Sequence, residues 1–312
     1  MNDVTTQFVD DRQRRRLERR FGVHVGDWLA ELPAVVDKLA AEWGLTVEGP
    51  APHGRTSVVL HVLDADGRKG VVKLSPDSGL AVAEAGLLRL WESTGRVPRV
   101  WGLHPRHGAV FMERVEGDTI AAKGEVPAME TVGALIADLH AVEVSRSQRQ
   151  ELPPLTSRVQ FVFDVSERER TEGPAAEVVP APVMHRARAL ARDLANGREG
   201  GVPLHGDLHP GNVIDGGERG LVALDPRGCL GDGAVDAVDW AMWKAGDRDE
   251  VERRVSVLSR VMDVDAERMM LWVRAFAPCL AVSKVNRGHV GAGEFDLLMD
   301  LAAGDPTPTP AR

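Results

Sequence analysis

The sequence predicts an α+β protein of two parts, a small antiparallel sheet in the first third of the chain and a mainly helical remainder. Two observations support this. Strand-like patterns are concentrated between residues 56 and 115, whereas residues 127–303 are mostly helical in pattern, with only two short strand signals. The 312 residues, 43% of them hydrophobic, are enough for two separate cores. We therefore expect a first domain at residues 1–115 and a second at residues 116–312.

The first part is expected to begin with two helices and to continue into two strand pairs. Six arginines between Arg12 and Arg20 accompany apolar residues at helical spacing, which favours a solvated helix over an anion-binding arm. The Asp66-Gly67 step is a hairpin signal between two β-branched or apolar stretches, and Ser78 can cap the next helix. The expected helices are residues 12–20, 28–43 and 81–91, and the expected strands are residues 56–63, 69–74, 97–103 and 109–115.

The second part is expected to be helical around a short strand-containing segment. Residues 145–182 contain five prolines among charged and Ser residues, so we expect a surface excursion there. The expected helices are residues 127–140, 184–194 and 234 to about 303, and the expected strands lie near Leu204 and at residues 221–224.

Composition and charge argue against several classes of function. The net charge is −9 and the chain has no Tyr, which disfavours nucleic-acid binding because phosphates repel an acidic protein and bases stack on aromatic rings. Residues 201–312 carry 18 acidic and 12 basic side chains, as suits either a cationic ligand or ordinary solvated helices. Cys229 and Cys279 are too few for a disulfide framework. No apolar run reaches the ~18 residues of a membrane span and no signal peptide is recognisable, so we expect a soluble, cytoplasmic protein.

The main chemical signal is the run His-Gly-Asp-Leu-His-Pro-Gly-Asn at residues 205–212, followed by Leu-Asp-Pro-Arg-Gly at residues 224–228. Asp207 and Asn212 have the spacing of the phosphoryl-transfer loop H-R-D-L-x-x-x-N, and Asp225 follows thirteen residues later at the end of an apolar stretch. In such a site one carboxylate accepts the proton of the attacking hydroxyl. An amide and a second carboxylate hold Mg²⁺ against the phosphates.

Other interpretations of these residues exist. Each residue alone would fit a polar turn or a hydrogen-bonded structural histidine. A di-metal phosphoesterase would use His205, Asp207 and His209 as metal ligands, but it would need further clustered histidines. The remaining candidates, His104, His107 and His140, are not grouped in that way.

A lysine and a glutamate upstream fit the same chemistry. Lys73 lies in the expected strand at residues 69–74, and Glu84 follows eleven residues later in the next helix. Glu84 can therefore pair with Lys73 and direct it at the α- and β-phosphates of a nucleotide.

The groups that would contact the rest of the nucleotide have weaker signals. Neither G-x-G-x-x-G nor the P-loop pattern occurs, so backbone N–H groups between Gly54 and Ser57 are the candidates for covering phosphates. The end of the last expected strand, from Phe111 to Val115, is the candidate hinge that contacts adenine through its backbone, with Glu113 and Val115 as the candidate residues.

With both sets of residues in place, the chain resembles the aminoglycoside phosphotransferases, in which His-Gly-Asp-Leu-His-Pro-Gly-Asn replaces a His-Arg-Asp loop. Residues 224–228 and the Gly231-Asp232 step resemble the streptomycin 6-kinase and hydroxyurea-resistance kinase branch. The resemblance implies a bilobal protein-kinase-like fold, with a small antiparallel-sheet N-lobe and a mainly helical C-lobe. It also implies ATP with Mg²⁺, and phosphorylation of a hydroxyl of an antibiotic such as streptomycin, or of hydroxyurea. The chain departs from the pattern near Gly233 and Val235, where a Pro and an aromatic residue are expected, and at Arg227, where a lysine is more usual.

Two features favour a small molecule over a protein as the acceptor. Gly206 stands where protein kinases have the arginine that binds a phosphorylated activation loop, and only about eight residues separate Asp225 from the helix expected at Ala234. The alternatives are a metabolic sugar or amino-alcohol kinase, or a non-catalytic nucleotide-binding scaffold.

The acceptor is expected beside the helix that follows the loop. If it is cationic, carboxylates and aromatic faces should line its site. Four of the candidates are spaced i, i+4, i+8 and i+11, so one helix face could present them, although the tryptophans could instead be core and Asp236 and Asp239 could brace the catalytic loop. The candidates are Asp232, Asp236, Asp239, Trp240, Trp243 and Asp247.

Overall fold

The computed structural model describes residues 8–51, 57–196, 201–288, 291 and 293–304. The chain divides into two compact units, Met1–Glu116 and Gly117–Arg312, and each is described by itself. The division falls one residue beyond the boundary expected at residue 115.

The first unit is built on a five-stranded antiparallel sheet with the spatial order β1-β2-β3-β5-β4. The strand pairs around Gly67 and Gly108 confirm the two predicted hairpins. The strand β1 was not predicted, because Gly49 and Pro50 are residues that usually weaken a strand. The elements are α1 (Asp11–Phe21), α2 (Val25–Trp43), β1 (Thr46–Pro50), β2 (Val58–Leu63), β3 (Lys69–Leu74), α3 (Ser78–Trp91), β4 (Val100–His104) and β5 (Ala109–Glu113).

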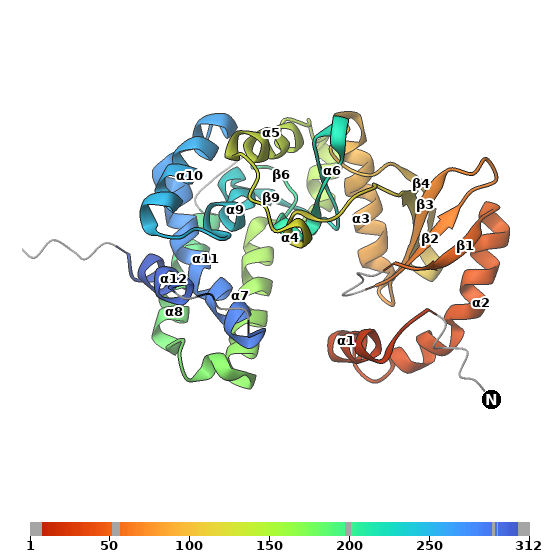
Figure 1. Cartoon of the computed structure of the whole chain (residues 1–312), viewed down its shortest axis with the longest axis horizontal. Helices are drawn as coiled ribbons and strands as arrows, with labels where there is room; N and C mark the ends of the chain where they lie inside the picture. The colour runs from red at the N-terminus through yellow and green to blue at the C-terminus, as the bar shows by residue number, and fades with distance from the viewer. Residues whose placement is uncertain (1–7, 52–56, 197–200, 289–290, 292, 305–312) are drawn as a thin grey trace, which may run out of the picture. The chain divides into compact units, whose positions relative to one another are not determined.

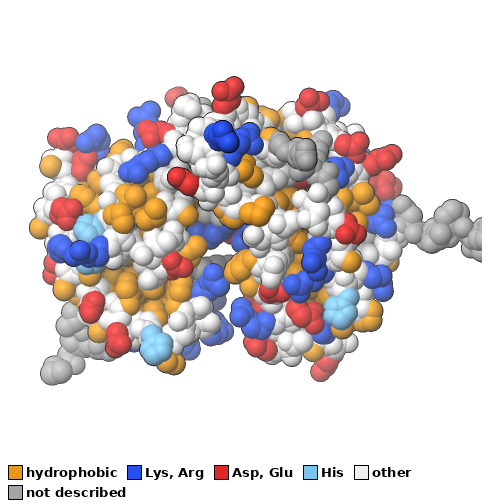
Figure 2. Space-filling model, turned by 180° about the vertical axis from the view of Figure 1, so that it is seen from behind, with side chains coloured by type: hydrophobic (Ala, Val, Ile, Leu, Met, Phe, Trp, Pro, Cys, Tyr) orange, Lys and Arg blue, Asp and Glu red, His pale blue; other side chains and the backbone are white. Residues whose placement is uncertain are grey.

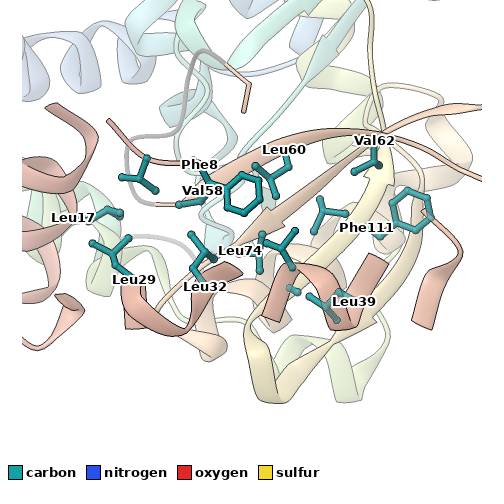
Figure 3. Close-up of a cluster of buried hydrophobic side chains, with 14 of the residues drawn as sticks. Phe8, Leu17, Leu29, Leu32, Leu39, Val58, Leu60, Val62, Leu74 and Phe111 are labelled. Carbon is teal, nitrogen blue, oxygen red and sulfur yellow. The ribbon is translucent and has the colours of Figure 1, made fainter. Parts of the chain in front are cut away.

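The core of this unit lies between the sheet and the two N-terminal helices (Figure 3). Alternate residues of β2 are buried, and the register pairs Leu60 with Val72 and Val58 with Leu74, so these four side chains share one face. Buried leucines of α1 and α2 cover that face: Leu17, Leu29, Leu32 and Leu39. Lys73, between Val72 and Leu74, must therefore point to the opposite face of the sheet.

The second unit is mainly helical, with two small two-stranded sheets, β6 with β9 and β7 with β8 (Figure 1). This confirms the prediction that the part of the chain after the sheet is mainly helical. The helices are α4 (Ile120–Lys123), α5 (Met129–His140), α6 (Arg146–Glu151), α7 (Leu155–Glu172), α8 (Ala181–Asn196), α9 (Val238–Met242), α10 (Arg248–Met262), α11 (Ala266–Asn286) and α12 (Glu294–Ala303). The strands are β6 (Val202–Leu204), β7 (Val213–Asp215), β8 (Leu221–Ala223) and β9 (Cys229–Gly231).

The segment expected to be a surface excursion, residues 145–182, is instead largely helical. Leu155, Val159 and Phe163 are buried at i, i+4 and i+8 of α7, which packs against α8 and α11. The prediction was wrong because frequent charged residues and flanking prolines hid this single apolar stripe.

Acidic and basic side chains are interspersed over the face shown in Figure 2. In the described ranges, no helix is both long enough and apolar enough to cross a bilayer.

Candidate active site

A short hairpin brings Asn212 and Asp225 to the same place. Val213 of β7 pairs with Ala223 of β8, so Asn212 and Leu224 flank the open end of the hairpin. The Leu224 backbone N–H donates to the Asn212 carbonyl at 2.7 Å. Asp225 follows directly with φ 57°, a left-handed conformation that non-glycine residues seldom adopt. The twelve residues between Asn212 and Asp225 are therefore the hairpin itself.

Asn212 also contacts Asp207. Its Nδ2 donates to the Asp207 backbone carbonyl at 2.9 Å and to the Asp207 Oδ2 at 3.3 Å. Both hydrogen bonds use the amide nitrogen, which leaves the amide oxygen to serve as a ligand. Asp207 and Asn212 are half-buried, so the edge of this loop is accessible.

An arginine from α7 meets the same carboxylate. Arg158 Nη2 lies 2.8 Å from Asp207 Oδ1, and its Nε donates to the Gly206 carbonyl at 2.7 Å. Sequence reasoning missed Arg158, because it lies 49 residues before Asp207 in a segment that was not expected to be a helix.

Asp236 braces the loop from beneath. Its buried carboxylate accepts hydrogen bonds from the backbone N–H groups of His205 (2.8 Å) and Gly206 (2.9 Å), and its Oδ2 lies 3.0 Å from His140 Nε2. Burial acts to raise the pKa of Asp236, but the His140 hydrogen bond and the Gly206 N–H outweigh it and lower the pKa. Of the two possibilities given for Asp236, an acceptor-site residue or a brace for the loop, its contacts fit the brace. His140, at the end of α5, has no local sequence signal.

The two histidines of the loop are engaged within it. His205 is fully buried, its Nε2 lies 3.0 Å from the Leu224 carbonyl, and its Nδ1 accepts from the Asp207 N–H at 3.3 Å. Burial lowers the pKa of His205, which favours the neutral ring. His209 Nδ1 accepts from the Gly211 N–H at 3.0 Å. These bonds argue against a di-metal phosphoesterase. Within the described residues no group of three or more His, Cys, Asp or Glu side chains could hold a metal.

Gly206 is required by the backbone of the loop. Its φ is 74°, and a Cβ placed on it would lie 2.4 Å from the Arg227 carbonyl oxygen. The Arg227 N–H donates to the His205 carbonyl at 2.8 Å, so the segment after Asp225 folds back against the loop. A side chain at position 206 would therefore be strained by contact as well as by conformation.

The predicted acceptor face does not form as one helix surface. Residues 233–237 form a 3₁₀ turn, and the α-helix begins only at Val238, so the assumed α-helical spacing is wrong there. Asp232 is buried, pairs with Arg268 and accepts from Trp272 Nε1 at 2.8 Å. Trp240 is fully buried in the core. Trp243 is half-buried, with Lys244 Nζ 5.2 Å from the centre of its ring.

Asp239 differs from these residues. It is half-buried, and no hydrogen bond or ion pair to its carboxylate is found within the described part of the chain. Burial raises the pKa of Asp239, and Asp207 nearby adds to this, whereas His209, Arg158 and Lys284 oppose it. A cation placed beside this carboxylate would favour its charged form and so offset the effect of burial.

The first unit contains a preformed lysine–glutamate pair. Lys73 Nζ lies 2.7 Å from Glu84 Oε1, and the two residues are only 6% and 3% exposed. Lys73 reaches α3 because it points to the face of the sheet opposite the α1–α2 layer. Ser57 is buried, and its carbonyl accepts from Gln13 Nε2 of α1 at 3.0 Å. Gly54, the other candidate for covering phosphates, lies outside the described residues.

The expected hinge follows the last residue of β5. Glu113 ends that strand, and its Oε2 accepts from the Arg99 N–H at 3.2 Å. Val115 lies beyond β5 in irregular backbone and is half-buried. Their contact with adenine remains a prediction.

An antiparallel sheet carrying a buried Lys–Glu pair, and a helical unit carrying an Asp–Asn loop with a following Asp, define the class of phosphotransferases with a protein-kinase-like fold. Solved structures agree. A choline/ethanolamine kinase family protein from Mesorhizobium loti superposes with a TM-score of 0.59 at 14% identity, covering 89% of this chain and 95% of that chain. Macrolide 2′-phosphotransferase type I gives 0.56 at 18% identity, covering 85% and 95%.

The chain belongs to the aminoglycoside/hydroxyurea antibiotic resistance kinase family, whose family model matches residues 42–288. It is 32% identical to streptomycin 6-kinase of Streptomyces glaucescens over 81% of this chain and 83% of that protein. It is 29% identical to hydroxyurea phosphotransferase of Kitasatospora aureofaciens over 90% and 82%. The chain is therefore a kinase that takes its phosphoryl group from ATP.

Proposed function

We propose that this protein is a Mg²⁺-dependent kinase that transfers the γ-phosphate of ATP to a hydroxyl of a cationic antibiotic such as streptomycin, and thereby inactivates it. The observation that carries the proposal is the Asp207 carboxylate, held through its two oxygens by Arg158 and Asn212. Two relatives of the chain, from Streptomyces glaucescens and Streptomyces griseus, are named streptomycin 6-kinases. An ATP-consuming reaction also supports a cytoplasmic location.

Asp207 would act as the catalytic base. It would accept a hydrogen bond from the acceptor hydroxyl, orient that oxygen towards the phosphorus and take the proton as transfer proceeds. Asp236 would hold the backbone of the loop in place during this step, because its carboxylate binds two of the loop's N–H groups.

Asn212 and Asp225 suit a magnesium ion. An amide oxygen and a carboxylate at the open end of one hairpin are hard oxygen donors, and Mg²⁺ in kinases takes only one or two protein ligands besides phosphates and water. Bound Mg²⁺ would neutralise the charge that develops on the transferred phosphoryl group.

The first unit would hold the nucleotide. Glu84 orients the Lys73 ammonium, which would bind the α- and β-phosphates. We further propose that backbone groups from Gly54 to Ser57 cover the phosphates, and that the backbone at Glu113 and Val115 binds adenine.

We propose Asp239 and Trp243 as acceptor-site residues. No hydrogen bond or ion pair reaches the Asp239 carboxylate among the described residues, and its pKa is raised, so a cationic group of the acceptor would stabilise its charged form. Trp243 would offer part of a ring face. Hydroxyurea and other neutral acceptors would gain nothing from Asp239.

The test measures transfer of labelled γ-phosphate from ATP to streptomycin, hydroxyurea, a sugar and an amino alcohol. Streptomycin is expected to be phosphorylated most efficiently. Asp207→Ala should bind nucleotide but lose turnover by ~10²-fold or more. The matched control is Asp215→Ala, an exposed aspartate three residues after Asn212 whose carboxylate pairs with Lys123 and accepts from the Gly217 N–H. Full turnover in Asp207→Ala would overturn the catalytic assignment, and transfer to the sugar or amino alcohol alone would indicate a metabolic kinase.

A further inference from the structure

Arg158 on α7 contacts two consecutive residues of the catalytic loop with one guanidinium group. Nε donates to the Gly206 carbonyl at 2.7 Å, and Nη2 binds Asp207 Oδ1 at 2.8 Å. The side chain is 16% exposed, so water competes weakly for these contacts. Because the guanidinium is planar and rigid, its two hydrogen bonds have a fixed geometry relative to each other. They therefore fix the orientation of the Asp207 carboxylate relative to the backbone of the same loop.

The second anchor of the Asp207 carboxylate is Asn212. With Arg158 on Oδ1 and Asn212 on Oδ2, rotation of the carboxylate plane would break both bonds. The terminal torsion of an aspartate is otherwise broad, without sharply preferred values. Arg158 therefore removes a rotational freedom that Asn212 alone, at 3.3 Å, restrains less firmly.

The start of α7 is itself fixed against the loop region. A Cβ on Gly231 of β9 would lie 2.4 Å from the Leu155 Cβ, so the first turn of α7 lies directly on that strand. The Leu230 N–H also donates to the Pro153 carbonyl at 2.9 Å. The Phe161 ring, 5.3 Å from the Arg158 guanidinium carbon, restrains the guanidinium from a further side.

We propose that Arg158 is a positioning residue for phosphoryl transfer, which holds the Asp207 carboxylate in the one orientation that receives the acceptor hydroxyl. The inference rests on the proposed function, in which Asp207 takes the hydroxyl proton. It assigns a role in turnover to an arginine from α7, outside the motif at residues 205–225.

The test compares Arg158→Ala with Arg170→Ala. Arg170 lies on the same helix, is similarly buried at 12% exposure and pairs with Glu167, so its loss perturbs α7 without touching the loop. Arg158→Ala should lower kcat by about 10²-fold, the scale of a misplaced reacting group. The KM for ATP should change by less than about twofold, because the nucleotide-binding groups are intact. Arg170→Ala should leave kcat unchanged.

Two further measurements separate positioning from a structural role. Methylguanidinium at non-denaturing concentration should restore part of the kcat of Arg158→Ala, since it can occupy the vacated space. Arg158→Lys, which keeps the charge but loses the fork, should fall between wild type and Arg158→Ala. Wild-type or raised kcat in Arg158→Ala, equal losses in the two alanine variants, or no rescue would overturn the proposal.

A double-mutant cycle does not depend on the identity of the acceptor. The changes in unfolding midpoint for Arg158→Ala and Asp207→Asn should not add in the double variant, because each removes the same ion pair. Additive changes would overturn the proposal whether or not the wild type phosphorylates any of the tested acceptors. If the wild type phosphorylated none of them, that result would by itself contradict only the proposed function.

Discussion

The Asp236 carboxylate supports the loop at residues 205–212 through backbone N–H groups, and its replacement by asparagine tests this directly. Oδ1 accepts from the Gly206 N–H, and Oδ2 accepts from the His205 N–H and faces His140. In Asp236→Asn one of these oxygens becomes an NH₂ group, which is a donor facing a donor. The less costly orientation keeps the oxygen at His205 and leaves the Gly206 N–H without an acceptor.

The expected loss in the free energy of unfolding follows from the number of N–H groups left without an acceptor. One buried N–H without an acceptor costs about 1–3 kcal/mol, so Asp236→Asn should lower the free energy of unfolding by that amount at pH 7. Asp236→Ala, which removes all three contacts, should cost about 3–5 kcal/mol. The pKa of Asp236 is lowered in the folded state, so its stabilisation is present above the unfolded value. The deficit of Asp236→Asn should therefore shrink as the pH falls below about 4.

The assay is urea-induced unfolding combined with kcat measured well below the unfolding transition. Asp232→Asn is the matched control, because Asp232 is equally a buried carboxylate but binds Arg268 and Trp272 rather than the loop. Both variants should lose stability, and only Asp236→Asn should lose kcat. An Asp236→Asn protein within about 0.5 kcal/mol of wild type, the range of neutral surface substitutions, would refute the reasoning.

Three further predictions concern single side chains. Lys73→Met should lower the free energy of unfolding by about 3–5 kcal/mol in urea titrations, because the buried Glu84 carboxylate loses its ammonium, and adding Glu84→Gln should recover most of this. Asp239→Asn should raise the melting temperature at pH 7. Because the pKa of Asp239 is raised in the folded protein, this gain should grow as the pH rises from about 4 and vanish below it; an equal gain at all pH values would contradict it. Gly206→Ala should cost about 1–3 kcal/mol from its positive φ and push against the Arg227 carbonyl, lowering kcat as well; unchanged kcat and melting temperature would count against it.

Local patterns were sufficient for much of the fold. The paired strands β2 and β3 follow from alternation around Gly67, and the helices α2 and α5 follow from apolar spacing. The run at residues 205–212 was recognisable because its residues are adjacent in sequence. The lysine–glutamate pair was predictable because a strand and the next helix are neighbours in the chain.

The residues that support the loop could not be found in this way. Arg158 and His140 meet partners 49 and 96 residues away, and only the tertiary packing of α7 and α5 brings them there. Asp236 and Asp239 are three residues apart but differ in environment. The change from a 3₁₀ turn to an α-helix at Val238 places the first beneath the loop and leaves the second without a partner among the described residues.

The α1–α2 layer has a practical consequence for producing this protein as a shorter fragment. The matched segment starts at residue 42, one residue before α2 ends, yet the helices ahead of it cover a full face of the sheet. An expression fragment cut to the shared segment would leave Val58, Leu60 and Val62 facing water, and it should aggregate on production.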